Sequence, residues 1–134
     1  MSLFSSKAAS IALVTTAVVN VCGGIGGLLL PELNVDLLYG TDVTLTPTHL
    51  RFHYIIWAFV LAMGVGYAVG ARNPLQQSGL LVAAGIGKLS IAFIWIEMLY
   101  SGLGTFLLIG SIAFDGLFGA YLLGVWMWGP KDSP

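Results

Sequence analysis

The stretch "GIGKLSIAFIWIEMLY", residues 85–100, is apolar almost throughout, yet it carries Lys88 and Glu97. A run of this length and hydrophobicity is typical of a helix that crosses a bilayer, for which about 20 apolar residues suffice. Charges inside such a helix are costly unless they have a partner. The stretch therefore predicts a membrane-spanning helix whose two charges need partners elsewhere in the chain.

The composition of the whole chain indicates that lipid surrounds most of it. Of the 134 residues, 57% are hydrophobic and only 8% are charged, whereas soluble domains have about 25% charged residues. The polar side chains are too few to cover a water-facing surface. The formal net charge of -1 and the lack of any basic run argue against nucleic acid as a partner.

The spans are expected at four apolar segments, residues 8–30, 48–71, 79–100 and 103–128. The first segment begins like a signal peptide, but its apolar run is long enough to cross a membrane, so we expect it to remain as a span. Thr46 and Pro47 read as the start of the second helix. The stretch from Pro31 to Thr46 is expected to be a loop, partly on the membrane surface. The sequence thus predicts one domain over residues 1–134, an all-α integral membrane four-helix up-down bundle.

The distribution of lysine and arginine predicts the orientation of the spans. Three basic residues fall on the side of the chain ends, and one falls on the other side among three acids. These are Lys7, Arg72 and Lys131 on the first side, and Arg51 with Glu32, Asp36 and Asp42 on the second. Cytoplasmic loops are the ones enriched in lysine and arginine. Both termini are therefore expected in the cytoplasm, with Arg72 in a cytoplasmic loop.

Small residues recur at four-residue spacing on every span, and such rows allow helices to approach closely in lipid. The rows are Gly23 and Gly27; Ala62, Gly66 and Gly70; Ala83 and Gly87; and Gly116, Ala120 and Gly124. They predict close packing within the bundle, or alternatively a face on which a second copy packs.

Lys88 and Asp115 are expected to meet near the middle of the membrane. At ~1.5 Å per residue, they lie about 14 Å and about 18 Å along two successive, antiparallel spans. Asn20, midway along the first span, is expected to join them by hydrogen bonding. The pair has two interpretations: a relay for protons or ions, since buried ionisable groups often line such paths, or a structural contact that fixes helix register.

A second polar group is expected near the opposite membrane surface, where the second span starts with "THLRFH". His49 and His53 share one helix face, and Arg51 or His53 is the expected partner of Glu97. Two histidines and a glutamate could in principle ligate a metal or contribute to a haem site, but no further histidine pair or cysteine set accompanies them. We therefore expect no metal site, and the sequence identifies neither a cofactor nor catalytic residues.

Three phrases carry a resemblance to a known group of proteins. These phrases are "GYAVGARNP", with Gly66, Tyr67, Ala71, Arg72 and Pro74; "GIGK", with Gly87 and Lys88; and "FDGLFGAYLL", with Asp115 and Phe118. Over roughly residues 50–128 the chain resembles small bacterial four-helix membrane proteins of the DoxX-like group. It lacks the tryptophans and the proline of that group's last phrase. The resemblance implies a bacterial inner membrane protein in which Lys88, Asp115 and Arg72 matter together, and it implies no activity.

Three functions remain open from the sequence. The leading one is a non-catalytic membrane subunit that forms a homo-oligomer or joins other membrane subunits. The second is a small transporter or a proton-conducting protein that uses Lys88, Asp115 and Glu97. The third is a membrane enzyme or cofactor binder that uses His49, His53 and Glu97.

Overall fold

The computed structural model describes residues 3–40 and 43–130, and the regular structure in these ranges is entirely helical. The elements follow in the order α1 (Ser6–Leu29), α2 (Pro31–Tyr39), α3 (Pro47–Gly70), the 3-10 turn η1 (Pro74–Gln76), α4 (Ser78–Tyr100) and α5 (Leu108–Trp128). Four of them, α1, α3, α4 and α5, are long and apolar enough to cross a membrane. The predicted all-α fold with four candidate spans is therefore confirmed.

The first three spans lie within two residues of their predicted bounds, and their starts follow from capping. The hydroxyl of Ser5 accepts a hydrogen bond from the backbone N–H of Ala8 at 3.3 Å. The hydroxyl of Thr46 accepts one from the N–H of His49 at 3.2 Å, and Pro47 occupies the first turn of α3. Both caps satisfy N–H groups that have no partner inside the helix.

Two segments differ from the prediction. Residues from Pro31 form the short helix α2 instead of a loop, and this helix has Pro31 at its first position and Glu32 in its first turn. The last span begins at Leu108 and not near residue 103, because the chain first turns through Gly102, whose φ is 73°. This left-handed conformation favours glycine and ends α4 sharply.

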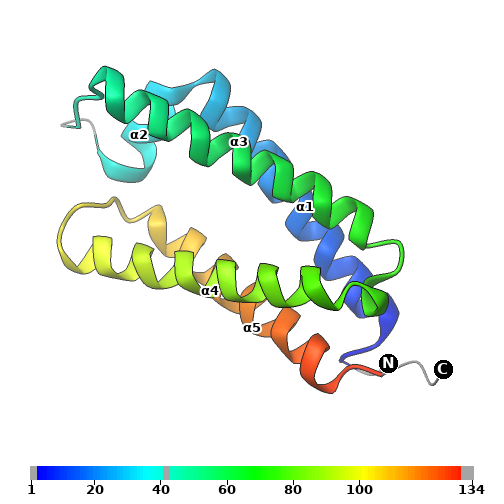
Figure 1. The fold of residues 1–134 in the computed structure, drawn as a ribbon. Helices are drawn as coiled ribbons and strands as arrows, with labels where there is room; N and C mark the ends of the chain where they lie inside the picture. Colours follow the sequence, from blue (N-terminus) through cyan, green and yellow to red (C-terminus); the bar gives the residue numbers. More distant parts are fainter. Residues whose placement is uncertain (1–2, 41–42, 131–134) are drawn as a thin grey trace.

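The four spans form two antiparallel hairpins, one of α1 with α3 and the other of α4 with α5. Figure 1 shows the hairpins closest at the end that holds the start of α1 and the end of α5, and separating toward the end that holds α2. Packing between helices is thus strong within each hairpin and local between the hairpins. The arrangement is compatible with a four-helix bundle that is tightest at one end.

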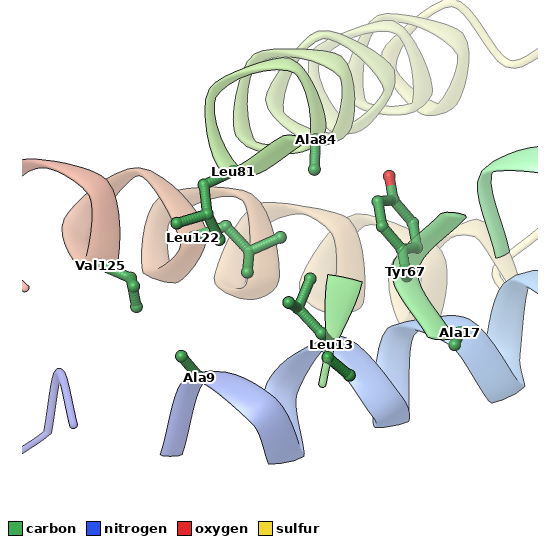
Figure 2. Close-up of a cluster of buried hydrophobic side chains, with 9 residues drawn as sticks. Ala9, Leu13, Ala17, Tyr67, Leu81, Ala84, Leu122 and Val125 are labelled. Atoms are coloured by element: carbon green, nitrogen blue, oxygen red, sulfur yellow. The ribbon is translucent and has the colours of Figure 1, made fainter. Parts of the chain in front are cut away.

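A cluster of buried side chains joins the hairpins at the end where they meet (Figure 2). It takes residues from all four spans: Ala9, Leu13, Ala17, Tyr67, Ala71, Leu81, Ala84, Leu122 and Val125. Leu13 and Leu122 are fully buried, and Tyr67 is only 3% exposed. These side chains stabilise the contact between the hairpins mainly by packing closely against one another. Burial away from lipid adds little, because lipid tails are as apolar as leucine.

Glycines allow α1 and α3 to touch backbone to backbone. A Cβ added at Gly24 would lie 2.9 Å from the backbone of Leu61, and one added at Gly64 would lie 2.9 Å from the backbone N of Val21. Neither position has room for a side chain. The sequence had singled out Gly23 on α1, but the tightest backbone contact is made by its neighbour Gly24.

Two of the predicted small-residue rows do not pack inside the molecule. An added Cβ at Gly66 of α3 or Gly87 of α4 would meet nothing within 4 Å. Ala62 and Ala83, from the same rows, are exposed. Of the two alternatives, packing within the chain therefore does not hold for Ala62, Gly66, Ala83 and Gly87, and it is Gly85 that approaches α5 in place of Gly87.

The helix α2 ties the two hairpins together at the end where they separate. The N–H of Thr105, in the turn before α5, donates a hydrogen bond to the carbonyl of Leu38 at 2.9 Å. The Thr105 hydroxyl also donates to the carbonyl of Leu37. The ring of Tyr39 lies 6.1 Å from that of Trp95 on α4, and burial raises the pKa of the Tyr39 hydroxyl. The molecule is thus connected at both ends, by the core cluster at one and by α2 at the other.

Candidate functional site

An ion pair between α4 and α5 is the most distinctive polar feature of the described residues. The Nζ atom of Lys88 lies 2.6 Å from Oδ1 of Asp115, and the two side chains are 7% and 16% exposed. Lys88 lies about 15 Å from the start of α4 at Ser78, at ~1.5 Å per residue, which is near the middle of a ~30 Å hydrocarbon layer. The structure therefore brings together the two charges that the sequence paired.

Close approach of the two helices explains why the pair is so short. A Cβ added at Gly85 would lie 3.1 Å from the carbonyl oxygen of Gly119, and the reverse distance is also 3.1 Å. These glycines stand about one helical turn from Lys88 and Asp115 respectively. Where α4 and α5 touch through glycine backbone, a lysine can reach an aspartate on the neighbouring helix without crossing lipid.

Aromatic side chains complete the surroundings of the pair. The Nζ atom of Lys88 lies 4.7 Å from the centre of the Phe114 ring, which itself packs on Phe118 at 4.6 Å. A cation over an aromatic face is attracted by the ring's quadrupole. Phe114 was not predicted as part of the site, although its position directly before Asp115 in the sequence was a signal that could have suggested it.

Tyr67 is the contribution of α3 to the core cluster that joins the two hairpins. Its ring belongs to the core cluster, and Figure 2 shows the ring extending away from α1. The tyrosine is nearly fully buried, with 3% of its surface exposed, and it lies one turn from the end of α3.

Asn20 does not join the pair. It is half-buried, and no hydrogen bond connects it with Lys88 or Asp115. Its Cβ would lie 3.1 Å from a Cβ added at Gly64, so it belongs to the interface of α1 with α3. The expectation failed because it relied on depth alone, while the hairpin arrangement directs Asn20 toward α3.

The buried histidine of α3 has a partner of its own. His53 is 8% exposed, and its Nε2 atom lies 2.9 Å from the carbonyl oxygen of Gly27. Because a carbonyl only accepts, Nε2 carries the proton and donates. The carbonyl of Gly27 is among the last four of α1, which have no partner inside the helix. His53 therefore satisfies the end of α1 and holds α3 against it.

The other members of the expected outer group lie apart. Glu97 is exposed, and its Oε1 accepts a hydrogen bond from the Ser101 hydroxyl at 3.0 Å. His49 and Arg51 are both exposed on the first turns of α3. Within residues 3–40 and 43–130 no ion pair links Glu97 to α3, and no three of the histidine, cysteine and acidic side chains are grouped to hold a metal. The separation of the hairpins at this end keeps Glu97 from α3.

Arg72 lies exposed in the turn between α3 and η1, at the end of the molecule where α1 starts. The adjacent carbonyl of Ala71 accepts a hydrogen bond from the Ser10 hydroxyl at 2.7 Å, which fixes this turn against α1. Arg72 makes no ion pair with Asp115. Lys131 and Asp42, which entered the predicted charge distribution, lie outside the described residues.

The arrangement is a buried, neutralised charge pair that is flanked by the ring of Phe114. Such a group can hold helices in register, and it contains protonatable atoms at the membrane centre. Comparison of the chain with models of protein families, with characterised proteins and with solved structures found no match.

Proposed function

We propose that the chain is a non-catalytic subunit of the bacterial inner membrane, which works as a homo-oligomer or within a larger membrane complex. Its four apolar spans are those of a small membrane protein. The proposal rests on one observation: the small residues of α3 and α4, Ala62 with Gly66 and Ala83 with Gly87, are left uncovered by the chain itself. In lipid, such rows are the surfaces on which helices pack.

In this proposal the Lys88–Asp115 pair is structural. A buried pair with good geometry fixes which residues of two helices face each other, because sliding either helix would expose an unpaired charge to hydrocarbon. Fixed register on α4 keeps Gly87 at a constant place on the outer surface. The relation to the DoxX-like group, supported by the phrases around Arg72, Lys88 and Asp115, is part of the same proposal.

The orientation with both termini in the cytoplasm also belongs to the proposal. Lys7 and Arg72 lie at one end of the molecule, while Arg51 lies at the other end together with Glu32 and Asp36. The excess of basic residues at the first end supports its cytoplasmic placement.

The test measures oligomeric mass after mild extraction from the native membrane. Native mass spectrometry should show the chain in a species heavier than 14.2 kDa. Gly66→Leu and Gly87→Leu should each shift that species toward the monomer, because a large side chain keeps a neighbouring helix at a distance. Gly110→Leu is the matched control, since Gly110 on α5 also has nothing within 4 Å but stands outside both rows. A monomer in native extracts, or equal masses in all three variants, would contradict the proposal.

A proton-conducting role is the second candidate, favoured by the two ionisable side chains, Lys88 and Asp115, that meet inside the spans. The two hairpins separate toward the end that holds α2, and in this candidate function a wider separation gives Lys88 and Asp115 access to that side of the membrane. Proteoliposomes loaded with a pH-sensitive dye should then show proton flux that disappears with Lys88→Met and persists with Glu97→Gln, since the structure places Glu97 away from the pair. The absence of flux in the native protein rejects this candidate. A cofactor site at His49, His53 and Glu97 lacks support, because His53 is bonded to Gly27 and Glu97 to Ser101.

A further inference from the structure

A groove of about 470 Å³ lies along the seam between α1 and α5. Its walls are formed by Ala8, Ile11, Ala12 and Thr15 of α1 and by Leu117 and Phe118 of α5. The volume lies in the range of about 300–1,000 Å³ that is usual for small-molecule sites. Most of the lining is apolar, so the groove suits a hydrocarbon chain and not a polar solute.

The groove occupies one leaflet of the membrane. Its lining on α1 extends from Ala8 to Thr15, which is about 10 Å at ~1.5 Å per residue. Half of a bilayer core is about 15 Å thick. At the end of the groove near the chain ends, the hydroxyl of Tyr121 donates a hydrogen bond to the carbonyl of Leu3 at 2.9 Å. This contact holds the segment before α1 over the groove and gives the groove a polar edge at the membrane surface.

A cation stands at the same edge. Lys7 is exposed in the first turn of α1, one helical turn before Ile11 and therefore on the same helix face. The only other charged residue on α1 or α5 is Asp115, which is paired with Lys88. No acid on either wall of the groove is thus free to offset the charge of Lys7.

We propose that this groove binds one acyl chain of an anionic phospholipid, whose phosphate contacts Lys7. The apolar walls accept the chain, and the lysine at the membrane surface attracts a negatively charged head group. Thr15 lies at the deep end of the groove, where the chain passes toward the membrane centre. The site lies apart from the outer rows of small residues on α3 and α4, and it borders the surroundings of the ion pair only through Phe118, which packs on Phe114.

Binding is tested by native mass spectrometry of the delipidated protein in detergent micelles, to which phosphatidylglycerol or phosphatidylcholine is added. The native protein should retain one phosphatidylglycerol, and it should bind phosphatidylcholine about fivefold more weakly, the ratio that one lysine near a membrane surface provides. Lys7→Gln should remove that difference between the two lipids. Ile11→Trp should abolish retention of either lipid because the indole fills the groove, while Ile86→Trp, at an exposed position on α4, should leave it unchanged.

Equal affinity of the native protein for the two lipids would overturn the proposal, as would full retention by Ile11→Trp. A dimer that Ile11→Trp dissociates would instead assign the groove to a second copy of the chain, and would also overturn it. Lys7→Gln changes an exposed side chain, so its result stands even where Ile11→Trp fails to fold. Because the same spectra report oligomeric mass, a failure of lipid binding is distinguished from a failure of the subunit proposal.

Discussion

Replacing Lys88 by methionine removes the ammonium group of the central pair while keeping a long apolar side chain in its place. Asp115 then remains between α4 and α5 with its side chain only 16% exposed and without its partner at 2.6 Å. The carboxylate must either stay charged in a poor solvent or take up a proton, and both alternatives destabilise the folded protein. We therefore expect Lys88→Met to lower the free energy of unfolding substantially.

The magnitude follows from two opposing effects. At 2.6 Å and an effective dielectric constant of about 20, the Coulomb attraction is about 6 kcal/mol, but desolvation of the two ions offsets much of it. Loss of one partner from a buried pair costs about 3–5 kcal/mol. Because Asp115 can take up a proton and so avoid an unpaired buried charge, we expect a loss at the lower end, about 3 kcal/mol. The double variant Lys88→Met, Asp115→Leu removes both charges and should return to within about 1 kcal/mol of the native protein.

The assay is reversible unfolding in mixed micelles with increasing dodecyl sulfate, followed by far-ultraviolet circular dichroism. Ile86→Met provides the control for placing methionine on α4, since Ile86 is exposed and outside the pair. The reasoning is refuted if Lys88→Met costs less than about 1 kcal/mol, or if the double variant is as unstable as Lys88→Met, because a buried unpaired charge is the source of the expected loss.

Three further predictions use other contacts of the structure. Gly64→Ala should lower the free energy of unfolding by about 1–3 kcal/mol, because the added Cβ would collide with α1. Gly66→Ala is the control: it has open space around it and should be neutral or stabilise by up to about 1 kcal/mol. Equal effects of the two substitutions would contradict the packing of α1 on α3. His53→Ala should cost about 1–3 kcal/mol in the same assay by leaving the carbonyl of Gly27 unsatisfied, and a neutral result would exclude the hydrogen bond. Thr105→Val removes the hydroxyl bond to α2, so amide hydrogen exchange over residues 31–39 should accelerate while exchange in α1 stays constant.

The spans were predictable because hydrophobic length alone determines them in lipid. The start of α5 was missed because it depends on the conformation of Gly102, about which hydropathy says nothing. The helix α2 was missed although Pro31 and Glu32 are ordinary signals of a helix start. Its nine residues are too few to form a stable helix alone, so the contacts with Thr105 and Trp95 decide its conformation.

The contact between Lys88 and Asp115 could be anticipated because the two residues stand at similar depth on helices that follow each other in the chain. The same argument from depth failed for Asn20 and for Glu97, whose expected partners lie in the other hairpin. Depth along a span carries no information on the angle between hairpins, and here that angle separates Glu97 from α3.

The rows of small residues show a similar limit. Four-residue spacing identifies a face of a helix, but several faces of these glycine-rich spans satisfy the pattern. Which face packs depends on the shape of the neighbour: Gly24 meets the backbone of Leu61, and Gly66 meets nothing. Only the three-dimensional arrangement distinguishes the faces used within the chain from those left over.

The pairing of neighbouring spans has a consequence for biosynthesis. Lys88 and Asp115 lie on consecutive helices, so both charges leave the ribosome within one helical hairpin. If α4 enters the bilayer together with α5, its lysine is neutralised at once, before the two hairpins pack against each other. Each half of the molecule therefore carries what it needs to insert, and docking of the two halves becomes a separate, later event that involves no exposed charge at the membrane centre.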